Sequence, residues 1–409
     1  MSQTTLNAHW AFFNAPKKND LLTAIAVRDA EELQLRKARE EIRAALRAGM
    51  ADWPSVITKQ ALFIREYARI SDSAPALKPR FRMQGSFAYD TANDPVPPQQ
   101  IDMDDGMYLP TEFINEQSGN RPIVPSKGYF EAVEAILKPL CAKKGWKLKQ
   151  KDTCVRVELT NRAHIDLPLY AIPLGEFNRL RETLAKSFHS QMAADAAYNG
   201  EDLVESYYRA LPADQIMLAH REKGWQASDP RKIEDWFLAA VKIHGPILRR
   251  LCRYLKAWRD HQWPGQPLSS LAIMASVVSI FERLKTDFSE SRDDVALLLV
   301  TEHLAAAFSG RVPNPVFPYV PELDLDRKWD EEGTRDSFVE RARGLHARVD
   351  EALNGTDVAA RSLAELQRCF GGRMTSDTSV IRKESRETEV KVYQPARVPP
   401  PVVGRTTSG

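Results

Sequence analysis

The sequence contains few cysteines, no long apolar run and no apolar leader. Its four cysteines include no CxxC pair, which argues against a disulfide framework or a zinc ribbon and is typical of a reducing compartment. No apolar run approaches the roughly 20 residues that a membrane-spanning helix needs, and the polar N-terminal segment is interrupted by Pro16. We therefore expect a cytoplasmic protein that does not associate with a membrane.

An excess of charge is also missing. Lys and Arg number 57 and Asp and Glu number 55, so the net charge is only +2. The surplus lies in residues 374–409, which leaves the rest of the chain neutral overall. This balance excludes a surface that is positively charged all over. Any site for a nucleotide is therefore local, and long nucleic acid is not an expected partner.

The length of 409 residues is typical of two packed domains. Strand-like alternation occurs between Phe81 and Pro173, and the chain is mostly helical from about Leu180 onward. Helical patterns cover 20–50, a segment from Pro54 to Ile70, 129–141, 233–259 with a break at Gly245-Pro246, 270–284 and 293–307.

These patterns predict an α/β or α+β fold in three parts. Residues 1–178 are expected to form a sheet domain with N-terminal helices, and residues 179–373 a helical lobe. Residues 374–409 are rich in Ser, Thr and Pro, and Ile381 is their only Leu, Ile, Phe or Trp. We expect this last part to be a disordered tail that supports no core.

Several common nucleotide and metal motifs are missing. The sequence has no GxxxxGK[ST], no GxGxxG and no HExxH, so P-loop, Rossmann and zincin sites are not supported. The acidic run from Asp102 to Gly106 does not fit an EF-hand, because its fifth position is Gly106 and its twelfth is Phe113.

One constellation of residues remains. Segment 84–87 (QGSF) is a small-residue turn that can open a helix and bring N–H groups to phosphate oxygens. Asp102 and Asp104 are two residues apart, so on a strand both carboxylates lie on one face while Met103 lies on the other. Asp166 lies in a later apolar strand, where a carboxylate is costly unless it is paired or binds metal.

Three converging carboxylates predict a magnesium site. Mg²⁺ prefers oxygen ligands and substrate phosphates, and two such ions can clamp an in-line phosphoryl transfer. Mn²⁺ can take the same place. In this chemistry Asp166 is the residue best placed to help activate the attacking hydroxyl.

The order GS, DxD, D is the signature of the DNA polymerase β-like nucleotidyltransferases. More specific segments resemble the bacterial cyclic GMP-AMP synthase type of the cGAS/DncV-like (CD-NTase) family, and the similarity runs from about Asn7 to about Arg373. The segments that carry it are 79–91, 101–108, 153–156, 164–173, 228–230 and 256–260.

The resemblance implies a nucleotidyltransferase core with a long N-terminal helix, packed on a helical lobe that grips ATP and GTP. It implies two successive Mg²⁺-dependent transfers that make a linear intermediate and then cyclic GMP-AMP, the signal of a CBASS antiphage defence system with a downstream effector that responds to the cyclic dinucleotide. Asp102 and Asp104 would bind the metal and Asp166 would complete the site. The nucleotide-binding residues implied by motif match are Gln84, Gly85, Ser86, Tyr89, Arg156, Ser228, Lys256 and Ser270.

Some of these assignments have structural alternatives. Ser228 precedes Asp229-Pro230, a helix-start signal, and Lys256 could be a surface lysine on an apolar helix. The loop after Pro313 is shorter than the family pattern, and Asn314 is the nearest polar residue to a donor-contacting acid that has no clear counterpart. The identity of the bases and the linkage, 3′,3′ or 3′,2′, therefore stay open, with 3′,3′ favoured.

Two further features fall outside the catalytic motifs. Arg39, Arg43 and Arg47 form one stripe on a helix and, with Arg80, resemble a folate-like allosteric pocket; a solvated helix face is the alternative. The chain ends at Gly409, and in the family an E1/E2-like enzyme can conjugate the synthase through its last residue; an ordinary frayed end is the alternative.

Two other functions compete with a cyclic dinucleotide synthase. A template-independent RNA nucleotidyltransferase, of the CCA-adding or oligoadenylate type, would need a basic groove, which the neutral charge disfavours. A catalytically inactive nucleotide sensor would be expected to lack one of the three acids, and all three are present.

Overall fold

A computed structural model describes most of the chain. The described residues are 5–51, 79–111, 113–116, 119–122, 125–175, 178, 216–263, 265, 268–285, 288 and 292–384. The helix expected between Pro54 and Ile70 and the proposed conjugation site Gly409 lie outside these residues.

The described elements alternate strands and helices in the first half and are mainly helical in the second. The helices are α1 (His9–Phe12), α2 (Leu21–Ala24), α3 (Asp29–Ala51), α6 (Gly85–Ala88), α7 (Ser126–Lys144), α10 (Arg231–His244), α11 (Pro246–Gln262), α12 (Ser270–Leu284), α13 (Asp293–Ser309), α14 (Arg335–Leu353) and α15 (Ala359–Phe370). The strands are β1 (Leu6–Asn7), β2 (Arg80–Gln84), β3 (Ile101–Thr111), β4 (Phe113–Glu116), β5 (Gly119–Pro122), β6 (Lys147–Gln150), β7 (Cys154–Glu158), β8 (Ala163–Pro173), β9 (Met217–His220), β10 (Gly224–Ala227) and β11 (Arg382–Lys383).

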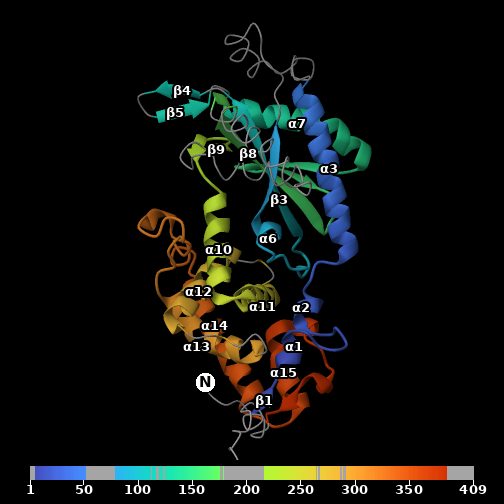
Figure 1. The fold of residues 1–409 in the computed structure, drawn as a ribbon, viewed down its shortest axis with the longest axis vertical. Helices are drawn as coiled ribbons and strands as arrows, with labels where there is room; N and C mark the ends of the chain where they lie inside the picture. The colour runs from blue at the N-terminus through green and yellow to red at the C-terminus, as the bar shows by residue number, and fades with distance from the viewer. Residues whose placement is uncertain are drawn as a thin grey trace, which may run out of the picture.

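Figure 1 shows two lobes, a sheet lobe with α3 and α7 and a helical lobe with α11 to α15, with α6 between them. The α+β fold class is therefore confirmed. In the main sheet the order is β10-β9-β8-β3-β2, and β3 and β8 are parallel. The other edge of β8 pairs with β7 and then with β9, both antiparallel.

The two faces of the sheet have different roles. Odd-numbered residues of β3 and β8, such as Met103 and Ile165, are buried in one core with Leu35 and Ile42 of α3. Even-numbered residues, which include Asp102 and the predicted acids of the site, lie on the opposite face because side chains alternate along a strand. The expected opposition of Met103 and the acidic pair is confirmed.

The helical lobe has its own core, built largely on α11 and α12. The break predicted at Gly245-Pro246 is confirmed, since Gly245 has φ of 80° between α10 and α11 and Pro246 begins the second helix. The expected helices over 270–284 and 293–307 correspond to α12 and α13. Among the described helices, none combines the length and the apolarity needed to cross a bilayer.

The structure corrects the predicted domain boundaries at the start of the chain and in its middle. Residues 5–25 were expected in the sheet domain, but Leu6, Phe12 and Ile25 are buried in the core of the helical lobe. β9 and β10 fall in the segment expected to be helical, yet they extend the sheet beyond β8. Both differences come from long-range packing, which local periodicity does not report.

The predicted tail begins too early. Residues 374–384 were assigned to it, but Met374, Val380 and Ile381 are buried in the core of the helical lobe. β11 pairs antiparallel with β1, near the other end of the described chain. A short segment with only a few apolar residues can be ordered when an existing core and a free strand edge receive it, and composition alone does not reveal either.

Candidate active site

The register of the sheet arranges the predicted acids in rows. In the strand register, Asp104 on β3 lies opposite Asp166 on β8. Arg156 on β7 lies opposite Asp166 on its other side. One step along the strands, Asp102 pairs with His164. The parallel pairing of β3 with β8 thus brings together acids that are about 60 residues apart in the sequence, and all of them lie on the face opposite α3.

Asp104 is the acid of the cluster whose pKa is strongly shifted. Its burial and the nearby carboxylates of Asp102 and Asp166 raise the pKa of Asp104 from 3.8 to about 8. Such mutual repulsion is relieved when a divalent cation binds between the carboxylates. Asp102 is the exposed member of the group, with a side chain that is 47% accessible.

Gly85 begins the short helix α6 directly beside Asp104. Its φ is 63°, and a Cβ at this position would lie 2.1 Å from Oδ2 of Asp104. Only glycine satisfies both the left-handed backbone and the close approach. The GS turn therefore presses its backbone against the acidic cluster, as a phosphate-binding turn next to a metal site requires.

A cleft of 330 Å³ opens at this point between α6 and the helical lobe, a volume in the range of small-molecule sites. The structure brings seven predicted residues into its lining: Gly85, Ser86, Tyr89, Asp102, Asp104, Lys256 and Ser270. Four others, Gln84, Arg156, Asp166 and Ser228, are not among the lining residues. Asp166 lies next to the cleft because it is opposite Asp104 in the strand register, and Arg156 follows on the other side of Asp166.

Gln84 is buried, and its side-chain amide forms hydrogen bonds with other residues of the sheet. Its nitrogen donates to the hydroxyl of Tyr108 at 2.8 Å, and the hydroxyl of Tyr170 donates to its oxygen at 3.2 Å. The two tyrosine rings are stacked with centroids 4.7 Å apart. The side chain of Gln84 therefore connects Tyr108 and Tyr170 within the sheet, next to Asp104 in the strand register.

Lys256 is buried rather than a surface lysine, so that alternative is wrong. Its ammonium group donates to the carbonyl oxygen of Thr91 at 2.6 Å. Burial lowers the pKa of Lys256 from 10.5 to about 8. The bond links α11 of the helical lobe to the loop that follows α6, so Lys256 joins the two lobes at the cleft.

Arg259 is a residue of the cleft that the sequence analysis did not single out. It is buried, pairs with Asp260 at 2.7 Å and donates to the hydroxyl of Ser270 at 2.9 Å. Its position three residues after Lys256 on α11 is the signal that could have identified it, because residues at this spacing share a helix face. Arg259 holds Ser270 at the first turn of α12.

Arg156 contacts an acid of the site. Its Nε and terminal nitrogen each lie 2.7 Å from an oxygen of Asp166, and this pairing raises the pKa of Arg156. In this arrangement Arg156 orients Asp166.

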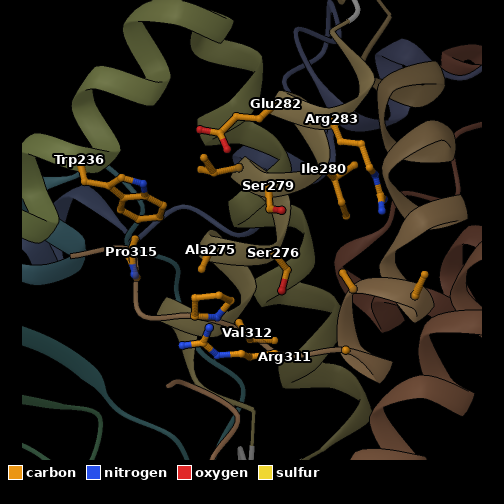
Figure 2. A pocket seen from close by; sticks show the side chains of 15 residues that line it. Trp236, Ala275, Ser276, Ser279, Ile280, Glu282, Arg283, Arg311, Val312 and Pro315 are labelled. Carbon is orange, nitrogen blue, oxygen red and sulfur yellow. The ribbon is translucent and has the colours of Figure 1, made fainter. Parts of the chain in front are cut away.

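Ser228 and Asn314 are not among the residues that line the cleft. The backbone of Ser228 donates to the carbonyl of Ile216, close before α10. Asn314 accepts a hydrogen bond from the N–H of Val316, so its oxygen closes its own turn. The neighbouring prolines of that loop line a second hollow of 510 Å³, which Figure 2 shows between Trp236 of α10, α12 and Arg311.

Part of the arginine stripe of α3 contacts the sheet. Nε of Arg43 donates to the buried carboxylate of Asp105 at 2.7 Å. The guanidinium groups of Arg43 and Arg47 lie 5.5 and 5.2 Å from the ring centre of Phe81. A solvated helix face is therefore wrong for Arg43, which contacts β2 and β3, whereas Arg47 is exposed and contacts the ring of Phe81 on β2.

The side chains at the acidic cluster fit a divalent cation. One ligand atom from each of Asp102, His164 and Asp166 lies within 4.8 Å of the others. His164 was not singled out as a site residue, although HxD on β8 repeats the spacing of DxD on β3. That repeated spacing is the sequence signal that could have identified it.

Two models of known protein families match this chain, one in the sheet lobe and one in the helical lobe. The family model for the nucleotidyltransferase domain of DncV-like cyclic GMP-AMP synthases matches residues 79–170, and the one for the C-terminal domain of cyclic GMP-AMP synthases matches residues 245–383. A cyclic GMP-AMP synthase of Escherichia coli is 33% identical over 308 residues, which are 73% of this chain and 69% of that protein.

Solved structures of Vibrio cholerae DncV are also similar. The complex with the linear intermediate 5′ pppA(3′,5′)pG has a TM-score of 0.74 and 27% identity, and covers 94% of this chain and 100% of that one. The complex with GTP and 5MTHFGLU2 has a TM-score of 0.76 and 28% identity, and covers 93% of this chain and 100% of that one.

Proposed function

Because this chain belongs to the family of DncV-like cyclic GMP-AMP synthases and is therefore a nucleotidyltransferase, we propose that it converts ATP and GTP into cyclic GMP-AMP with 3′,3′ linkages. The observation that carries the proposal is the pairing of Asp102 and Asp104 with the second acidic strand at the edge of a cleft. A V. cholerae relative has been solved with a linear intermediate, which supports two successive transfers in one site.

Asp102, Asp104 and Asp166 would hold two Mg²⁺ ions. When bound, these ions would neutralise phosphate charge and lower the pKa of the attacking hydroxyl. Burial, and after it the carboxylates of Asp102 and Asp166, raise the pKa of Asp104, and a bound cation would favour its charged form. Arg156 holds Asp166 by two hydrogen bonds, so this carboxylate is oriented before substrate arrives.

The donor triphosphate would lie against the α6 turn and the helical lobe. Gly85 and Ser86 offer backbone N–H groups and a hydroxyl from one side, and Lys256 and Ser270 line the cleft from the other. Tyr89 lines the same cleft and can stack on the donor base. These contacts would bring the α-phosphate next to the acids and exclude water from it.

The acceptor nucleotide would approach from the side of Arg156. Its guanidinium keeps part of its surface accessible while it pairs with Asp166, since the side chain is 21% exposed. It can therefore contact an acceptor phosphate at the place where the hydroxyl meets Asp166. Ser228 would lie near a base only if the acceptor extends toward α10.

Purified full-length protein should be incubated with the four nucleoside triphosphates, singly and in pairs, with Mg²⁺. We expect a phosphatase-resistant cyclic dinucleotide from ATP with GTP, fully digested by nuclease P1. The variant Asp102→Ala with Asp104→Ala should form none. Full activity in that variant would contradict the proposal, and a ladder of linear oligonucleotides would favour the RNA nucleotidyltransferase instead.

We further propose that a folate-like ligand binds at Arg39, Arg43, Arg47 and Arg80. A V. cholerae relative was solved with 5MTHFGLU2, and several cationic side chains on one side of α3 suit a ligand with multiple carboxylates.

The biological setting that we propose is a CBASS antiphage system in the cytoplasm, with an effector that responds to the product. Conjugation through Gly409 by an E1/E2-like enzyme belongs to the same proposal, and deletion of Gly409 should abolish a covalent adduct.

A further inference from the structure

His164 occupies the same relation to Asp102 that Asp166 occupies to Asp104, because both pairs are opposite each other on β3 and β8. The imidazole is buried, and its Nε2 lies 3.0 Å from Oδ1 of Asp102. The sheet therefore presents four side chains in a two-by-two array on the face of the site. Three of them are carboxylates and the fourth is a histidine.

Gln100 determines which ring nitrogen of His164 carries a proton. The amide nitrogen of Gln100 donates to the carbonyl oxygen of Asn161 at 3.2 Å, and its Oε1 lies 2.8 Å from Nδ1 of His164. A carboxamide oxygen only accepts hydrogen bonds, so Nδ1 is the protonated nitrogen. In the neutral ring, Nε2 then has the free lone pair, and this lone pair lies beside Asp102.

Nε2 is a buried nitrogen without a hydrogen-bond partner among the described residues, although Asp102 is so near. A shared proton lies close to the line between two atoms, whereas a metal bonded to both lies off that line. With metal–ligand bonds of about 2.1 Å in an octahedron, adjacent ligand atoms are about 3.0 Å apart. The separation of Nε2 from Oδ1 matches two neighbouring ligands of one cation.

We propose that His164 binds a divalent cation directly through Nε2, together with Asp102 and Asp166. The inference rests on the metal site of the proposed function and deepens it, since that site was assigned carboxylates alone. A nitrogen ligand favours first-row transition metals over Mg²⁺, which prefers oxygen. The site therefore selects Mn²⁺ over Mg²⁺, and His164 supplies most of that selectivity.

The test uses the full chain with Mn²⁺ alone, without nucleotides. Pulsed EPR of the wild type should show hyperfine coupling to a histidine nitrogen, and His164→Gln should lack it. In competition titrations, the ratio of the Mg²⁺ to the Mn²⁺ dissociation constant should fall about tenfold in His164→Gln. Asp102→Asn should weaken the binding of both metals.

His220 provides the matched control, because it is a buried histidine of the same sheet lobe that does not belong to the cluster. His220→Gln should leave the nitrogen coupling and the selectivity unchanged. Absence of coupling in the wild type would overturn the proposal, whatever the stability of the variants. Because the readout is metal binding without substrate, that outcome would leave cyclic dinucleotide synthesis untouched.

Discussion

Arg156 and Asp166 form a two-pronged ion pair across neighbouring antiparallel strands, with both hydrogen bonds at 2.7 Å. The pair places a fixed positive charge next to a cluster of acids that repel one another. It also gives Asp166 a single orientation. Arg156 thereby orients Asp166. The part of its side chain that stays accessible can contact an acceptor nucleotide.

Two substitutions of Arg156 should show how much of its effect on activity comes from its charge and how much from its two parallel hydrogen bonds. We expect Arg156→Lys to lower kcat/KM about tenfold and Arg156→Ala about a hundredfold, because lysine keeps a charge but cannot form two parallel bonds with the carboxylate. Initial rates measured against ATP and GTP separately would check this. Equal activity of the lysine variant and the wild type would contradict a role for the paired geometry.

Gly85 should be irreplaceable for a local reason. A Cβ there would meet Oδ2 of Asp104 at 2.1 Å, so Gly85→Ala should displace that carboxylate and lower kcat at least about a hundredfold. Gly145 is the matched control, since it also has a positive φ, of 71°, but no atom within 4 Å of its Cβ position. Gly145→Ala should cost about 1 kcal/mol of stability and leave activity intact. Comparable activities of the two variants would contradict the proposed clash.

Lys256 should impose a pH limit on activity. Because burial lowers its pKa to about 8, the free enzyme loses this positive charge as the pH rises through 8, and kcat/KM should fall there. Lys256→Arg should move the decline to higher pH, because a guanidinium stays protonated. Identical pH profiles of kcat/KM for the two proteins would assign the decline to another group.

The same shift affects stability with a defined sign. Between pH 8 and 10.5 the unfolded chain binds a proton at Lys256 that the folded chain does not, so this residue's contribution to the free energy of unfolding rises with pH. The stability of Lys256→Met relative to wild type should therefore be greater at pH 7 than at pH 10. Urea denaturation at both pH values would measure the difference, and a constant difference would contradict the shift.

Two truncations should separate the tail from the fold. Removing residues 385–409 should leave the melting temperature unchanged, because their composition predicts a tail that supports no core. Removing residues 374–409 also deletes β11 and buried Met374, Val380 and Ile381, which should cost at least about 3 kcal/mol. Thermal unfolding of both proteins would check this. Equal melting temperatures would place residues 374–384 outside the core.

Arg47 should be the most informative arginine for the folate-like pocket. Arg43→Ala would leave the buried carboxylate of Asp105 without its partner and destabilise the fold, whereas Arg47 is exposed and contacts the ring of Phe81 on β2. We expect a folate polyglutamate to raise the melting temperature of the wild type and not that of Arg47→Ala. An equal rise in both would remove Arg47 from the pocket.

Much of the candidate site could be predicted because it depends on local patterns. The spacing of Asp102 and Asp104 and the small residues at 85–86 specify a face and a turn within a few residues, and the break at Gly245 follows from backbone chemistry. His164 was missed because the HxD spacing, although it repeats the DxD spacing, does not by itself reveal which strand lies beside it. Its role depends on which residue of β3 lies opposite it.

The sequence by itself determined the alternation that puts Asp102 and Asp104 on one face, the helix boundaries around Gly245 and the family motifs. Only the tertiary structure decided that Asp104 pairs with Asp166, that Asp102 pairs with His164, and that the start of the described chain and residues 374–384 complete the helical lobe. The physical reason is the distance along the chain over which each effect acts. Backbone geometry and side-chain alternation act over a few residues, whereas strand register and core packing join segments that are distant in the chain.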